Sequence, residues 1–89
     1  MTQYNVFYKD LQIGCLEIND TGQYRYTPID EAISSIEEKV SLNYCLKNTY
    51  DWGNPIPFFS ERIRNASRFN LKRIQYHTDY FIMEEVENE

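Results

Sequence analysis

The feature that most constrains the fold is a pair of alternating segments, residues 3–8 and 11–18, with only Lys9 and Asp10 between them. Apolar and polar residues alternate with a period of two in both segments, which is typical of half-buried β-strands. So short a connection predicts an antiparallel hairpin. The alternation in the second segment slips at Gly14, and a glycine at such a slip predicts a β-bulge.

Three further segments have the character of extended chain. Residues 23–27 follow the turn signal Asn-Asp-Thr-Gly and end before Pro28, whose missing N–H cannot join a sheet ladder. Residues 74–83 alternate over their whole length and predict a C-terminal strand. Residues 40–46 also alternate, so we expect a strand or an extended segment there. Three N-terminal strands joined by short turns predict an antiparallel meander.

Two segments, residues 30–39 and 57–69, repeat apolar residues at helical spacing. The apolar stripe of the second consists of Phe59, Ile63, Ala66 and Phe69. A polar loop, residues 48–54, precedes this helix and holds the only tryptophan. The predicted fold class is therefore α+β. We expect an antiparallel sheet of four or five strands, made of the N-terminal three-strand meander plus the C-terminal strand, with two helices packed on one face.

Length and charge limit the class of protein. A chain of 89 residues provides a single domain, residues 1–89, and the acidic residues 84–89 are expected to form a frayed tail. The net charge of −5 is opposite in sign to that of most nucleic-acid binders. There is no apolar run of about 18 residues, no signal-like N-terminus, and no CxxC motif that includes Cys15 or Cys45. We therefore expect a cytoplasmic protein with reduced thiols, no membrane association and no nucleic-acid partner.

The only histidine, His77, lies two residues before Asp79, so both side chains share one face of the predicted strand. A carboxylate beside an imidazole can orient it and raise its basicity, which makes a small enzyme using His77 one interpretation. No motif joins this pair to a nucleophile such as Ser60 or Cys45. One histidine and two distant cysteines are too few for zinc, and three scattered glycines form no phosphate loop. We therefore predict no catalysis, no metal and no cofactor.

Eight tyrosines are more than a core of this size can bury. Half-exposed tyrosine is typical of protein-binding surfaces, and tyrosine is also enriched in strands simply because aromatic residues suit them, so both explanations stay open. Trp52 could anchor in a partner's pocket or pack on the protein's own core. Basic residues that repeat every four positions predict a positive helix face, which meets either a partner or only water. The candidate interface residues are Tyr50, Trp52, Arg64, Arg68 and Lys72. We predict a non-catalytic protein-interaction or regulatory module that binds another protein or a second copy of itself.

The acidic balance permits another interpretation, an inhibitor that imitates the phosphate backbone of DNA and blocks a DNA-binding enzyme. Such mimicry requires rows of carboxylates at about phosphate spacing. Here 14 acidic residues are interspersed with nine basic ones, and five of the basic residues lie between positions 62 and 73. We therefore place mimicry below protein interaction.

Four short motifs lie between residues 4 and 63. They are Gly14-Cys15-Leu16, a glycine-plus-aromatic strand with Gly22, Tyr24 and Tyr26, the segment Val40-Ser41-Leu42-Asn43-Tyr44-Cys45-Leu46, and the helix start Pro57-Phe58-Phe59. Together they resemble the N-terminal subdomain of HipA-type toxin kinases. The family continues with Leu-Pro-Glu-Gly, whereas this chain has Arg62-Ile63-Arg64-Asn65 and no kinase core. The resemblance implies a stand-alone form of that subdomain, which partners and restrains a separate kinase.

Overall fold

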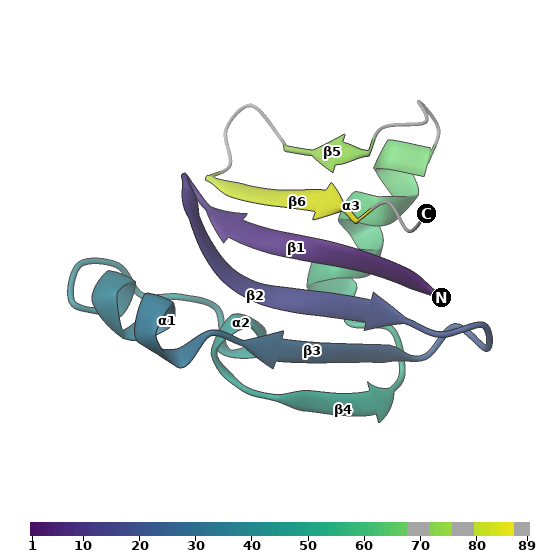
Figure 1. Ribbon diagram of the computed structural model, residues 1–89, viewed down its shortest axis with the longest axis horizontal. Coiled ribbons are helices and arrows are strands. Elements are labelled where there is room, and N and C mark those ends of the chain that lie inside the picture. The colour runs from purple at the N-terminus through teal and green to yellow at the C-terminus, as the bar shows by residue number, and fades with distance from the viewer. Residues whose placement is uncertain (68–71, 76–79, 87–89) are drawn as a thin grey trace.

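The computed structural model describes residues 1–67, 72–75 and 80–86 (Figure 1). Within them six strands form one antiparallel sheet in the order β4-β3-β2-β1-β6-β5, together with three helices, so the predicted α+β class is confirmed. The strands are β1 (Thr2–Tyr8), β2 (Leu11–Ile18), β3 (Tyr24–Pro28), β4 (Tyr50–Gly53), β5 (Arg73–Ile74) and β6 (Phe81–Glu85). The helices are α1 (Asp30–Glu37), α2 (Tyr44–Lys47) and α3 (Pro57–Ser67).

The first three strands form the predicted meander, with β2 paired to β1 on one side and to β3 on the other. The register between β1 and β2 shifts once. Val6 lies opposite Gly14 and Phe7 lies opposite Gln12, which leaves Ile13 as the additional residue in β2. The bulge predicted at Gly14 is therefore confirmed, one residue from the predicted position.

The predicted C-terminal strand, residues 74–83, is wrong in its extent. Two strands, β5 and β6, take its place and pair with each other, so that Ile74 lies opposite Met83. β6 also pairs with β1 and joins the hairpin to the meander. Ile74 and Met83 are both buried. Two paired strands that each alternate apolar and polar residues therefore look, in the sequence, like one long alternating strand. Residues 76–79 lie outside the described part of the chain.

The middle of the chain, residues 40–54, differs from the prediction in two places. Residues 44–47 form α2 where a strand or extended segment is predicted, because Asn43 caps this helix: its Oδ1 accepts a hydrogen bond from the backbone N–H of Cys45, 3.2 Å away. The predicted polar loop contains β4, which pairs with β3 and places Tyr50 opposite Tyr26. With the C-terminal hairpin, these elements bring the described residues to six strands and three helices instead of four or five and two.

The helix α3 crosses one face of the sheet, as predicted, and lies behind the strands in Figure 1. Phe59 and Ala66 of its apolar stripe are buried and Ile63 is half-buried, whereas Phe69 lies outside the described residues. The other predicted helix, α1, lies beside the end of β3 (Figure 1) and buries its own apolar side in the same core. The sheet therefore has one face covered chiefly by α3.

Tyr26 of β3 lies at the centre of the core and is completely buried. Its ring centroid is 5.3 Å from that of Phe59, and its hydroxyl donates a hydrogen bond to the backbone oxygen of Leu46 at 2.9 Å. Gly14 lies directly under the ring, since a Cβ at this position would be 2.5 Å from Tyr26 Cζ. One side chain thus connects β2, β3, α2 and α3.

We expect Gly14→Ala to lower the free energy of unfolding by about 1–3 kcal/mol, because the added methyl group would overlap the ring of Tyr26. Urea denaturation followed by circular dichroism measures this change. In a Tyr26→Leu background the same substitution should be less destabilising, since the smaller side chain leaves room for the methyl group. Equal losses in the two backgrounds would contradict the packing of Tyr26 over Gly14.

Burial raises the pKa of three tyrosine phenols, those of Tyr26, Tyr4 and Tyr24, above the ordinary value of 10.0. The unfolded chain therefore loses these protons first, so the stability present at neutral pH falls as pH rises through about 9 and above. Tyr26→Phe should lose about 1–2 kcal/mol at neutral pH, because the Leu46 carbonyl loses its donor. It should also show a shallower decline in unfolding free energy from about pH 8 to about pH 10.5. Urea titrations across this range measure both effects, and a decline as steep as that of the unsubstituted protein would count against the buried phenol.

Candidate binding site

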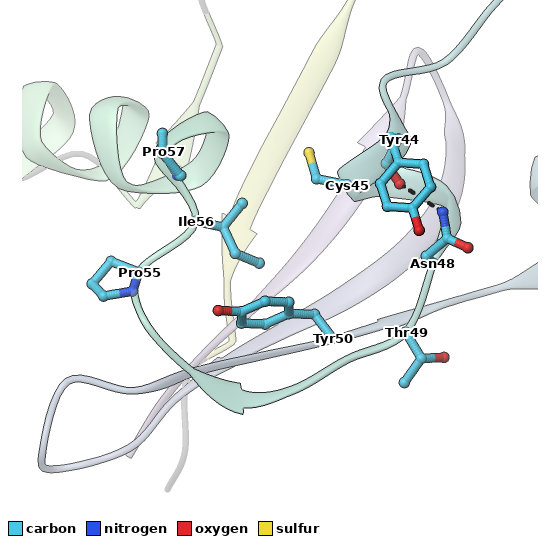
Figure 2. Close-up of a pocket in the computed structure, with 8 residues that line it drawn as sticks. All are labelled: Tyr44, Cys45, Asn48, Thr49, Tyr50, Pro55, Ile56 and Pro57. Carbon is cyan, nitrogen blue, oxygen red and sulfur yellow. Dashed lines mark hydrogen bonds between the residues drawn. The ribbon is translucent and has the colours of Figure 1, made fainter.

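A pocket of about 400 Å³ opens where α2, β4 and the start of α3 meet (Figure 2). Its walls come from α2 and the residues that follow it, from the first residue of β4, and from the turn that leads into α3. The lining residues are Tyr44, Cys45, Asn48, Thr49, Tyr50, Pro55, Ile56 and Pro57. We refer to this site as the tyrosine–proline pocket.

The α2 side of the pocket is held by two asparagine side chains. Asn43 caps the start of the helix through the N–H of Cys45, and the Asn48 side-chain amide donates to the backbone oxygen of Tyr44 at 3.0 Å. These two hydrogen bonds hold α2, a helix of only four residues, at both of its ends. Tyr44 is 74% exposed, so its ring is presented to solvent at the margin of the pocket instead of packing in the core.

The opposite side of the pocket is built from Tyr50 and the turn into α3. The Tyr50 hydroxyl donates to the backbone oxygen of Asn54 at 3.0 Å, and Figure 2 shows its ring extending from β4 toward Pro55. Gly53 permits this position, since a Cβ there would lie 2.7 Å from the hydroxyl oxygen. Ile56 is buried, and its backbone oxygen accepts the first hydrogen bonds of α3, so Pro57 lies in the first turn, where a missing N–H is tolerated.

None of the eight lining residues carries a formal charge at neutral pH. Burial is the main influence on the Cys45 thiol and raises its pKa, which keeps the sulfur protonated. Lys47, on the same short helix, pairs with Glu37 of α1 at 3.0 Å. The pocket is therefore an uncharged surface of aromatic rings and prolines with hydroxyl and amide groups at its margin.

The side chains of the lining can be compared with those used in acid–base chemistry. The lining contains no carboxylate, imidazole or amine, the side chains that most often transfer protons in enzymes. Thiol nucleophiles act as thiolates, and a raised pKa at Cys45 disfavours that form. Aromatic rings with polar atoms at their edges instead form contacts that combine apolar burial with hydrogen bonding.

Of the five predicted interface residues, Tyr50 lines the pocket. Between the pairs Tyr26–Tyr50 and Tyr24–Gly53 the strand β4 has one residue more than β3, and this bulge places Trp52 on the opposite face of β4 from Tyr50. Arg64 is exposed on α3. Lys72 lies immediately before β5 and outside α3, so the predicted repeat of basic residues does not run along a single helix as far as Lys72. Arg68 lies outside the described residues, as do His77 and Asp79 of the predicted histidine–aspartate pair.

Trp52 packs against its own sheet. The guanidinium carbon of Arg25 lies 4.7 Å from the centroid of the indole ring, and the same guanidinium donates two hydrogen bonds to Glu17 at 2.8 and 3.0 Å. Arg25 precedes Tyr26 in β3, and consecutive strand residues point to opposite faces. Trp52 and the tyrosine–proline pocket are therefore on opposite faces of the sheet and do not form one site.

Residues 1–67, 72–75 and 80–86 contain no group of three or more histidine, cysteine, aspartate or glutamate side chains positioned to hold a metal ion. No helix within these residues is long and apolar enough to cross a membrane.

Most of the pocket is missed by reasoning from the sequence, because residues 40–46 are interpreted as a strand and residues 48–54 as a loop. One local signal points to α2: Asn43, directly before the helix, is of a residue type preferred at the N-cap position. The Pro55-Ile56-Pro57 run marks the start of α3, but only the tertiary fold brings it beside α2.

Comparison with protein-family models, curated proteins and solved structures found no match. The resemblance to the N-terminal subdomain of HipA-type kinases therefore stays a prediction. Of its motifs, the one at Gly14 lies at the bulge of β2, the one at Pro57 opens α3, and the segment 40–46 contains the start of α2.

Arg25→Ala removes the cation above the only tryptophan. We expect the fluorescence emission of Trp52 to shift to longer wavelength and its quenching by acrylamide to increase, because the ring gains contact with water. The free energy of unfolding should fall by no more than about 1 kcal/mol, since the ion pair with Glu17 is partly exposed. Arg64→Ala is the control and should leave the emission unchanged. Unaltered emission in Arg25→Ala would rule out the stacking.

Proposed function

We propose that the protein is a non-catalytic protein-interaction module that binds its partner through the tyrosine–proline pocket. The observation that carries this proposal is an exposed tyrosine, Tyr44, at the margin of an uncharged pocket of about 400 Å³. Pockets of roughly 300–1,000 Å³ with apolar walls and a few polar groups are typical of binding sites.

The choice of residues supports a protein as the partner. Tyrosine is enriched at protein–protein interfaces, because its ring buries a large area with few rotatable bonds and its hydroxyl can still bond at the edge. Tyr44 on α2 is placed in this way, and Tyr50 on β4 adds a second ring whose hydroxyl is bonded to Asn54. Pro55 and Pro57 add apolar surface with little side-chain entropy to lose on binding.

The absence of charge also bears on the alternatives. Arginine and lysine are the side chains that bind phosphorylated or carboxylate metabolites most strongly, whereas the side chains that line this pocket carry no positive charge. The interpretation as a DNA mimic is weakened by pairing, since Glu17, Glu37 and Glu84 each lie within 3.3 Å of a basic group. Carboxylates neutralised in this manner do not present a row of phosphate-like charges.

Affinity capture from a nuclease-treated lysate of the protein's own host, with quantitative mass spectrometry, tests the proposal. Because truncating a tyrosine that is an interface hot spot costs about 2 kcal/mol or more, we expect a stoichiometric partner whose recovery falls at least about tenfold with Tyr44→Ala. Tyr80→Ala is the matched control, because Tyr80 is also exposed (60%). It lies just before β6, which is separated from the edge strand β4 by β3, β2 and β1.

Two results would overturn the proposal: no stoichiometric partner at all, or a partner recovered equally well with Tyr44→Ala and with Tyr80→Ala. A kinase as the captured partner would in addition support the resemblance to the HipA-type subdomain. Circular dichroism of both variants verifies that they are folded, as expected for substitutions of exposed side chains.

A further inference from the structure

We infer that the occupant of the tyrosine–proline pocket is an uncharged, proline-containing segment of the partner in the polyproline II conformation. This inference rests on the pocket being a protein-binding site. It adds the chemical class of the ligand, which follows from the charge of the pocket, from the edge of β4 and from the groups at the pocket margin.

Charge complementarity favours a neutral segment. The eight lining residues carry no charge, although the chain as a whole has a net charge of −5. The ammonium group of Lys47, the basic residue of α2, is paired with Glu37. A charged peptide group placed in the pocket would lose water and find no opposite charge among the eight lining side chains, which is unfavourable.

The edge of the sheet beside the pocket does not favour the addition of a strand. β4 has four residues and contains a bulge, because Tyr24 pairs with Gly53 whereas Tyr26 pairs with Tyr50. The backbone N–H of Trp52 donates to the Asp51 carboxylate at 2.9 Å and is thereby diverted from pairing with another strand. Short, bulged edges with a charged residue are features that oppose strand pairing.

A polyproline II segment needs no such ladder. Its backbone carbonyls all point outward and accept hydrogen bonds from side chains, and its conformation is already formed before binding. Such segments dock on surfaces lined with aromatic side chains. Here Tyr44 and Tyr50 supply the rings, and the Tyr44 hydroxyl has no protein hydrogen-bond partner among the described residues, so it can donate to a ligand carbonyl.

Two other occupants fit less well. An amphipathic helix uses anchors three to four residues apart over several turns, and the pocket of about 400 Å³ offers space for one such cluster. A second copy of this chain has a single Pro-x-Pro sequence, Pro55-Ile56-Pro57, whose Ile56 is only 7% exposed and forms part of the pocket itself. The segment therefore comes from a different protein.

The test is a titration of the ¹⁵N-labelled full-length protein, followed by NMR, with an acetylated and amidated peptide of repeating Pro-Pro-Leu. We expect shifts at Tyr44, Asn48 and Tyr50, and at least about tenfold weaker binding by Tyr44→Ala, whereas Tyr80→Ala should bind within about twofold of the unsubstituted protein. A peptide with alanine in place of every proline should bind at least about tenfold more weakly, because it lacks the preformed conformation.

Shifts absent from the pocket, equal binding of the alanine peptide, or preferential binding of an uncharged amphipathic helical peptide would each overturn the inference. If the lysate partner is still captured in a Tyr44-dependent manner, the proposed interaction function holds and only the ligand class is wrong. If Tyr44 affects neither experiment, both proposals fall.

Discussion

The elements around Tyr26 depend on the packing and the hydrogen bond of its buried phenol. Its ring fills the space above Gly14, packs against Phe59 of α3, and directs its hydroxyl to the backbone oxygen of Leu46 at 2.9 Å. Leaving a buried hydroxyl and carbonyl unpaired is unfavourable by about 1–3 kcal/mol, which is a large share of the stability of a domain of this size. The same hydroxyl also lies 3.4 Å from the backbone oxygen of Ile13, so Leu46 provides the shorter of its two contacts, and α2 is the turn that brings Leu46 there.

The geometry of the tyrosine–proline pocket follows from this contact. Once Leu46 is fixed by Tyr26, its neighbours Tyr44 and Cys45 have a defined position, and the Asn48 amide holds the turn closed. Tyr50 lies opposite Tyr26 on the neighbouring strand and is held by Asn54. A pocket whose walls are already fixed by hydrogen bonds loses little conformational entropy when it binds.

The parts of this fold that could be predicted from sequence are those governed by local periodicity. The β1–β2 hairpin, the bulge beside Gly14 and the apolar stripe of α3 all follow from spacing alone. The short elements could not be predicted in this way: α2 depends on the cap by Asn43 and on the buried bond to Tyr26, and β4 depends on pairing with a distant strand. For the site, Tyr50 could be selected by residue type, but only the sheet separates it from Trp52, which stacks on Arg25 on the other face.

The net charge of the chain and the chemistry of the tyrosine–proline pocket are two separate properties of this molecule. The net charge of −5 acts over distances of about a Debye length and would favour the approach of a basic partner, an effect that is weakened by salt and bears mainly on the rate of association. The tyrosine–proline pocket has no charged lining residue, so its contacts act only at short range and bear mainly on the rate of dissociation. A partner of the kind proposed above can therefore be basic as a whole while the segment that it inserts is neutral, because the two properties would be recognised in different steps of binding.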